Sequence, residues 1–183
     1  MEGTERIRRI VSDLKHFSHT DQDKRKPTDI NKELETTLNV VWNELKYKCT
    51  IVKDFGELPL LLCNPGQLNQ VFANLFINAA QAIEKQGTIT ITTRHVTAGA
   101  GKKEDSVQKE YIEIGISDTG SGIAEDKIEK IFEPFFTTKE VGKGTGLGLS
   151  IVYDIIKKHN GDITVQSEAG KGTNFTVRLP VVS

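Results

Sequence analysis

The sequence predicts an α/β two-layer sandwich, in which a mixed β-sheet carries helices on one face. Stretches with helical periodicity are interleaved with stretches in which apolar and polar residues alternate, and the two patterns indicate helices and strands. The predicted strands at 88–96 and 111–118, and those at 162–168 and 173–181, follow each other without an intervening helix. Such pairs are hairpin-like and need no helical crossover, so we expect a mixed sheet with its helices gathered on one face.

The composition is that of an ordinary globular protein. The 183 residues are 37% hydrophobic and 27% charged, which suits one domain with an accessory segment. The net charge of −1 gives no reason to expect nucleic acid as a partner. No apolar run could span a bilayer, so we expect a cytoplasmic location and leave open whether a longer parent protein is membrane-anchored. Cys49 and Cys63 lack metal-site spacing and are expected to be reduced and buried.

Residues 4–20 are predicted to form a separate helix. Its apolar residues recur at heptad-like spacing and are Ile7, Ile10, Leu14 and Phe17. Such a stripe packs either on the chain's own domain or on a partner helix, and the polar linker at 21–29 favours the partner. We therefore divide the chain into an accessory segment, 1–28, and a main domain, 29–183, and expect weak homodimerisation through the helix.

The remaining elements are predicted from periodicity and from their end signals. Asp29 and Asn64 are helix caps, Pro65 suits a first helical turn, and Asn160-Gly161 ends the last helix. In order, the chain is predicted to form a helix at 30–46, strands at 49–55 and 58–63, a helix at 65–84, strands at 88–96 and 111–118, helices at 124–131 and from about 146 to 158, and strands at 162–168 and 173–181.

The polar side of the predicted helix at 65–84 carries Asn74 and Asn78. Asparagine is a poor helix former, and side chains four positions apart lie one above the other. An amide oxygen is a hard, neutral ligand that suits Mg²⁺ together with phosphate oxygens. The pair therefore indicates a metal and phosphate site, although two amides bonded within the protein would explain it if it stood alone.

Two glycine-centred blocks supply the rest of a nucleotide site. In the block DTGSG, Asp118 ends a predicted strand and can accept a hydrogen bond from the adenine N6 amine, while Gly120 and Gly122 allow close approach of a base. The block GKGTGLGL, at 142–149, precedes a helix, and its backbone amides suit phosphate. It matches neither a Walker A loop nor a dinucleotide fingerprint. On its own, DTGSG would be read as an ordinary turn.

Between these blocks the segment 132–146 contains FEPFFTTK and lacks periodicity. We expect it to act as a lid that orders over bound nucleotide. Lys139 and Lys143 lie in it and are candidate phosphate ligands, although most loop lysines are simply solvated.

Taken in this order, the four blocks resemble the N, G1, F and G2 boxes of the catalytic and ATP-binding half of bacterial two-component sensor histidine kinases, over about 29–182. The resemblance implies the Bergerat ATP-binding fold. It also implies ATP and Mg²⁺ as cofactors, and transfer of the γ-phosphate, leaving ADP, to a histidine of a missing phosphoacceptor domain for relay to a response regulator. Residues 1–28 resemble the end of the family's dimerisation domain.

The same resemblance implies roles for individual residues. Asn78 would ligate Mg²⁺, Asn74 would assist at the metal and phosphates, and both count as catalytic. Asp118 would bind adenine beside Gly120 and Gly122, with support from Thr173. The residues implied at the phosphates are Lys139, Lys143, Gly144, Thr145, Gly146, Leu147 and Gly148.

One feature of complete kinases is absent. Their phosphoacceptor histidine precedes an acidic residue, with a proline a few positions later, and none of His16, His19, His95 and His159 fits that pattern. We therefore expect ATP binding without autophosphorylation by this chain alone.

Two other functions remain open at this stage. ATP hydrolases and clamps of the same fold, as in gyrase, mismatch-repair proteins and heat-shock chaperones, place a glutamate base where this chain has Asn74, and an amide cannot accept a proton at neutral pH. The other is a non-catalytic nucleotide-responsive module, or a serine-kinase-like regulator of a transcription factor's inhibitor.

Overall fold

A five-stranded mixed sheet forms one layer of the molecule. The computed structural model describes residues 24–98, 109–137 and 145–181. In sheet order the strands are β2 (Cys49–Phe55), β4 (Gly87–Ala98), β5 (Lys109–Asp118), β7 (Gly172–Pro180) and β6 (Asp162–Glu168). β2 runs parallel to β4, and every other neighbouring pair is antiparallel. The predicted mixed sheet is confirmed.

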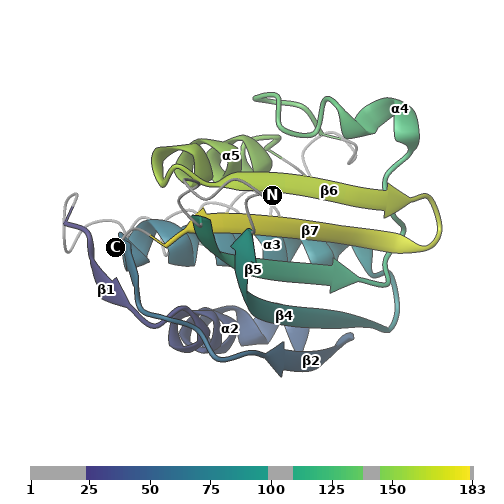
Figure 1. The fold of residues 1–183 in the computed structure, drawn as a ribbon. Coiled ribbons are helices and arrows are strands. Elements are labelled where there is room, and N and C mark those ends of the chain that lie inside the picture. Colours follow the sequence, from purple (N-terminus) through teal and green to yellow (C-terminus); the bar gives the residue numbers. More distant parts are fainter. Residues whose placement is uncertain (1–23, 99–108, 138–144, 182–183) are drawn as a thin grey trace.

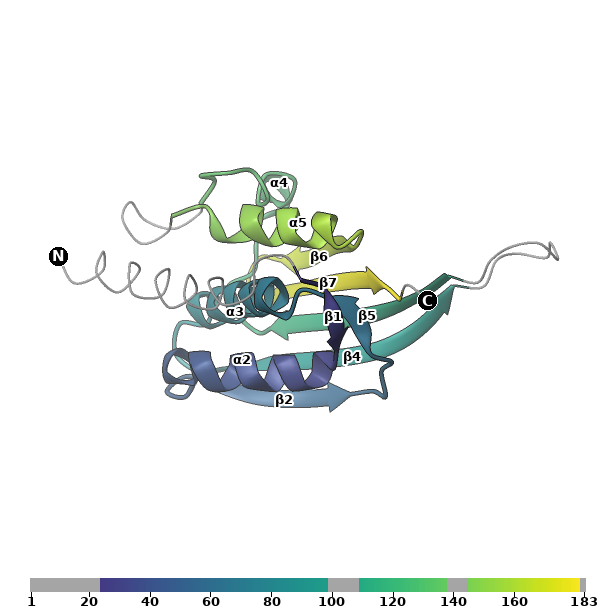
Figure 2. The same ribbon diagram turned by 90° about the vertical axis from the view of Figure 1, so that its left-hand side faces the viewer.

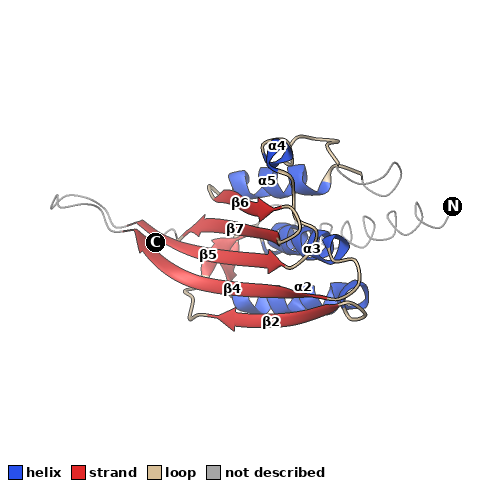
Figure 3. Ribbon diagram, turned by 90° about the vertical axis from the view of Figure 1, so that its right-hand side faces the viewer, coloured by secondary structure: helices blue, strands red, loops and turns tan. Residues whose placement is uncertain are grey.

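Three helices form the second layer. They are α2 (Ile30–Leu45), α3 (Pro65–Ala82) and α5 (Gly148–Lys158), and they lie side by side on one face of the sheet, with α3 in the middle (Figures 1 and 2). Figure 3 shows the strands in front of these helices, so the opposite face of the sheet carries no described helix. Fully buried side chains such as Phe72 and Phe76 of α3 fill the space between the layers.

The predicted helix ends are formed by local hydrogen bonds. The Asn64 side chain accepts from the backbone N–H of Gln67 at 3.2 Å, and Pro65 occupies the first turn of α3. At the end of α5, Asn160 adopts a left-handed φ of 56°, and the N–H of Gly161 bonds to the Ile156 carbonyl at 2.9 Å. This is the αL termination that an Asn-Gly pair favours.

Some boundaries differ from the sequence prediction. α3 ends at Ala82 rather than near Glu84, because Ile83 turns to an extended conformation. α5 begins at Gly148 rather than near Gly146, whose φ of 67° is incompatible with a right-handed helix. The short helix α4 spans only Glu125–Ile128.

The predicted linker is partly a strand. β1 (Lys26–Thr28) pairs antiparallel with β3 (Leu61–Cys63) in a separate two-stranded sheet. Pro27 fits there because a strand with only one neighbour does not need every N–H in a ladder. β3 is shorter than the predicted strand at 58–63, which contains Pro59. The predicted helix at 4–20 lies outside the described residues.

Candidate functional site

Three polar side chains form a row across neighbouring strands at one end of the sheet. In the strand register Asp118 of β5 stands opposite Thr173 of β7, and Thr173 stands opposite Ser167 of β6. Asp118 and Thr173 are buried. The structure therefore brings together the predicted adenine ligand Asp118 and its predicted support Thr173, and it adds Ser167, which the sequence analysis did not single out.

The carboxylate of Asp118 is held by backbone donors. Gly120 donates its N–H to Asp118 Oδ1 at 2.8 Å, and the backbone of Thr173 lies opposite Asp118 on β7. Burial raises the pKa of Asp118, and the backbone N–H groups of Gly120 and Thr173 oppose the increase. Since a carboxylate can accept about four hydrogen bonds, Asp118 keeps the capacity to accept one from an exocyclic amine.

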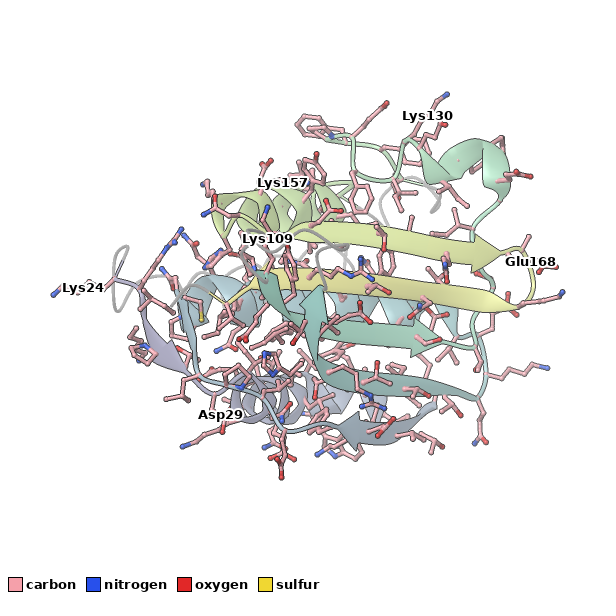
Figure 4. The ribbon with its side chains drawn as sticks, in the orientation of Figure 1. Lys24, Asp29, Lys109, Lys130, Lys157 and Glu168 are labelled. Atoms are coloured by element: carbon pink, nitrogen blue, oxygen red, sulfur yellow. The ribbon has the colours of Figure 1, made fainter. Side chains whose placement is uncertain are left out.

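The glycines of DTGSG are required by packing against the protein itself. A Cβ on Gly120 would lie 2.6 Å from the Ala82 Cβ at the end of α3. Gly122 has a φ of 66°, and a Cβ there would lie 2.0 Å from the carbonyl oxygen of Glu168, which Figure 4 labels at the turn between β6 and β7. The loop is thus pressed between α3 and this turn, a reason that the sequence could not supply.

Asn74 meets the beginning of α5. Its amide nitrogen donates to the Gln70 carbonyl at 2.9 Å, and a Cβ on Gly148 would lie 3.1 Å from its Oδ1. The amide oxygen therefore faces the first residue of α5, where the sequence predicts phosphate. Asn78 lies one turn further along α3 and is partly exposed.

The first turn of α5 is suited to an anion. Leu147 caps this helix without a side-chain hydrogen bond, and the first N–H groups of a helix have no intrahelical partner. They and the helix dipole favour a phosphate group at this end. Gly146 approaches the F segment, because Phe135 donates its N–H to the Gly146 carbonyl at 2.9 Å.

One helix joins the two ends of this site. Asn74, Asn78 and Ala82 follow each other at four-residue spacing in α3, so they lie along one side of the helix over about 12 Å. Asn74 is at the phosphate end, and Ala82 packs against Gly120 beside Asp118. Thr145, which the sequence places at the phosphates, is exposed and accepts from the Leu147 N–H at 3.4 Å.

Three predicted phosphate ligands, Lys139, Lys143 and Gly144, lie outside the described residues, as does much of the predicted lid. Within the described ranges no group of three or more His, Cys, Asp or Glu side chains could hold a metal ion. The amide oxygens of Asn74 and Asn78 are the side-chain groups that the sequence predicts for a metal here, and Mg²⁺ accepts amide and phosphate oxygens.

Comparison of the sequence with known protein families shows to which family the chain belongs. Residues 63–183 match the family described as histidine kinase-, DNA gyrase B- and HSP90-like ATPase. The chain belongs to this ATPase family. Membership implies the use of ATP, in agreement with the sequence analysis.

Sensor kinases are among its relatives. The chain is 52% identical over 157 residues to the sensor kinase CckA of Brucella abortus (strain 2308), covering 84% of this chain and 16% of the relative. It is 36% identical over 179 residues to the sensor histidine kinase ZraS of Escherichia coli (strain K12), covering 97% of this chain and 36% of the relative. The chain thus spans about a sixth to about a third of these proteins.

Solved structures confirm the fold. A nucleotide-free form of the catalytic domain of histidine kinase ThkA is 26% identical and superposes with a TM-score of 0.71, over 87% of this chain and 97% of that domain. The mycobacterial sensor histidine kinase MprB, at 23% identity, shares the fold with a TM-score of 0.70, over 85% of this chain and 97% of the solved chain. The chain is therefore homologous to sensor histidine kinases, and the predicted Bergerat-type fold is confirmed. No described helix is long and apolar enough to cross a membrane.

Proposed function

We propose that this chain is the catalytic domain of a sensor histidine kinase, which transfers the γ-phosphate of ATP to a histidine of a separate phosphoacceptor domain for relay to a response regulator. The observation that carries the proposal is that α3 connects a buried carboxylate at Asp118 with the helix start at Gly148. The distance along α3 leaves room for a ribose between a base and its phosphates.

At the adenine end, Asp118 accepts a hydrogen bond from the N6 amine. Gly120 holds the carboxylate through its N–H group, Thr173 lies opposite Asp118 on β7, and Gly122 keeps the loop against the β6–β7 turn. Because the Gly120 donor comes from the backbone, the carboxylate is oriented before nucleotide arrives, which lowers the entropic cost of binding.

At the phosphate end, backbone amides of Gly144, Gly146, Leu147 and Gly148 bind phosphate oxygens, assisted by Lys139, Lys143 and Thr145. Asn78 ligates Mg²⁺, and the orientation of the Asn74 amide oxygen toward Gly148 supports its role beside the metal and phosphates. Bound Mg²⁺ supplies neutralisation of phosphate charge. The protein contributes positioning, which is the main demand of phosphoryl transfer.

Asn74 favours phosphotransfer over hydrolysis. Its amide nitrogen is engaged by the Gln70 carbonyl, and an amide cannot take a proton from water at neutral pH. Activity on a histidine substrate therefore distinguishes the proposal from the ATP hydrolases of the same family.

The first experiment is calorimetric titration with a non-hydrolysable ATP analogue, with and without Mg²⁺, on the wild-type protein and on Asp118→Asn. The proposed nucleotide site is supported if the wild type binds the analogue in a Mg²⁺-dependent way and Asp118→Asn loses this binding. The control Asp126→Asn, at an exposed position, should retain it. A folded wild type that does not bind would overturn the proposed site.

The second experiment supplies a helical domain that carries a phosphoacceptor histidine, together with labelled ATP. Transfer of label to this domain supports the kinase function. Rapid hydrolysis without any histidine substrate would favour the hydrolase alternative, and tight binding without transfer would favour a nucleotide-responsive module. A cytoplasmic location of the parent protein stays part of this proposal.

A further inference from the structure

Ser167 joins three segments around the candidate adenine site. Its Oγ donates to the Gly172 carbonyl at 2.9 Å and accepts the backbone N–H of Ile123 at 2.8 Å. It also lies 2.9 Å from Thr173 Oγ1, at hydrogen-bonding distance. The hydroxyl of this β6 residue therefore touches the loop after DTGSG and the first two residues of β7, the second of which stands opposite Asp118.

The hydrogen bonds of Ser167 fix the orientation of the Thr173 hydroxyl. A serine hydroxyl has one proton to donate and two lone pairs to accept with. The proton of Ser167 goes to Gly172, whose carbonyl oxygen can only accept. The hydrogen bond between the two hydroxyls must then be donated by Thr173, with Ser167 as its acceptor.

Thr173 consequently has no donor left for a ligand. Its backbone N–H lies in the β5–β7 ladder, where Thr173 stands opposite Asp118, and its hydroxyl proton bonds to Ser167. What Thr173 still offers is a lone pair on Oγ1. Asp118, as a carboxylate, is also only an acceptor.

We propose that Ser167 is a positioning residue for base specificity, because it turns the Thr173 hydroxyl so that the side chains at the adenine end are all acceptors. Adenine presents an amine at position 6, whereas hypoxanthine presents an oxygen there. The 6-oxo group of hypoxanthine would face acceptors of the protein, and a buried polar group would be left without a hydrogen-bond partner. The cost of that unpaired group discriminates strongly against hypoxanthine. This inference rests on the proposed binding of ATP at Asp118.

The test compares ADP with IDP, which differ in the base alone, by calorimetry on the whole chain. The variants are Ser167→Ala, Ser167→Thr and the control Ser117→Ala, whose side chain lies on the opposite face of β5. In Ser167→Ala the Thr173 hydroxyl is released and can donate to the 6-oxo group. We expect the preference for ADP over IDP to fall by about tenfold. Ser167→Thr and Ser117→Ala should keep it.

A purely structural role for Ser167 would weaken both nucleotides equally, and an unchanged ratio of affinities in Ser167→Ala would overturn the inference. A wild type that binds neither nucleotide would overturn the proposed function as well, so the two failures are distinguishable. If Ser167→Ala is poorly folded, Thr173→Val provides a second test. Removing the lone pair on Oγ1 should also lower the preference for ADP, and an unchanged preference there would contradict the inference.

Discussion

The imidazole of His159 joins the end of α5 to the beginning of α3. Its Nε2 lies 3.2 Å from the backbone nitrogen of Asn64 and accepts its N–H, while Nδ1 lies 2.8 Å from the Ile155 carbonyl and donates to it. Both ring nitrogens are therefore used by the neutral imidazole. Protonation of the buried ring would place a donor against the N–H of the residue that caps α3.

This arrangement predicts a loss of stability in mild acid. Burial lowers the pKa of His159 from its ordinary 6.5, the nearby charge of Arg25 lowers it further, and the hydrogen bond to Ile155 opposes both. The unfolded chain thus binds a proton at a higher pH than the folded protein does. The stabilisation is complete above about pH 6.5 and is lost as the pH falls from there through the lower folded pKa.

Urea unfolding of wild type and His159→Leu at pH values from about 8 to about 5 measures this effect. The variant should be less stable at neutral pH by about 1–3 kcal/mol, since the Asn64 N–H loses its acceptor. The difference between the two proteins should shrink as the pH falls. If the difference in unfolding free energy between the two proteins stays constant from the highest to the lowest pH, His159 is not the group that causes the loss of stability in acid.

Gly122 and Gly170 form a matched pair for testing the packing of the DTGSG loop. Both have a left-handed φ, but a Cβ on Gly122 would meet the Glu168 carbonyl, whereas nothing lies within 4 Å of a Cβ on Gly170. Gly170→Ala should cost only the conformational strain, about 1–2 kcal/mol. Gly122→Ala should cost at least about 3 kcal/mol, because the clash adds to the strain. Equal unfolding midpoints for Gly122→Ala and Gly170→Ala would show that the loop moves away from Glu168 at no measurable cost.

Replacement of Asn78 tests the metal site. Asn78→Ala should reduce the Mg²⁺-dependent part of nucleotide affinity by at least about tenfold, because mutation of even an outer-shell partner of a metal commonly costs that much. Binding without Mg²⁺ should change little. Asn43→Ala, on the exposed side of α2, is the control. A variant whose response to Mg²⁺ equals that of the wild type would remove Asn78 from the metal site.

The apolar stripe at 4–20 predicts weak self-association. Sedimentation of the wild type at rising concentration should show an increasing average mass, and Leu14→Asp should abolish the increase, because a charge in a helix–helix seam is costly. A constant monomer mass for both proteins would remove the proposed dimer.

Features set by neighbouring residues in sequence could be predicted well. Asn64-Pro65 and Asn160-Gly161 form the expected helix ends, because their hydrogen bonds are local. The row made by Ser167, Thr173 and Asp118 could not be predicted, since it depends on the register between three strands. The alternation of β6 was visible, but nothing in it indicated which serine would meet Thr173.

The glycines illustrate the same limit. Gly120 and Gly122 were expected to make room for a base, and the structure gives them a second reason in Ala82 and Glu168, which are far away in sequence. Gly172 was not singled out, although its φ is 108° and a Cβ there would lie 1.9 Å from the Asp118 carbonyl. Close approach of two backbones leaves no pattern in a single sequence.

The pairing of β1 with β3 has a mechanical consequence. β3 ends at Cys63, directly before the residue that caps α3, and Arg25 donates to the Lys158 carbonyl at the end of α5 at 2.8 Å. A pull on the chain at Lys24, which Figure 4 labels beyond β1, therefore acts on the starting point of α3 and on the last turn of α5. Part of the load enters α2, which begins at Ile30 directly after β1, and part reaches α3, the helix that carries Asn74 and Asn78.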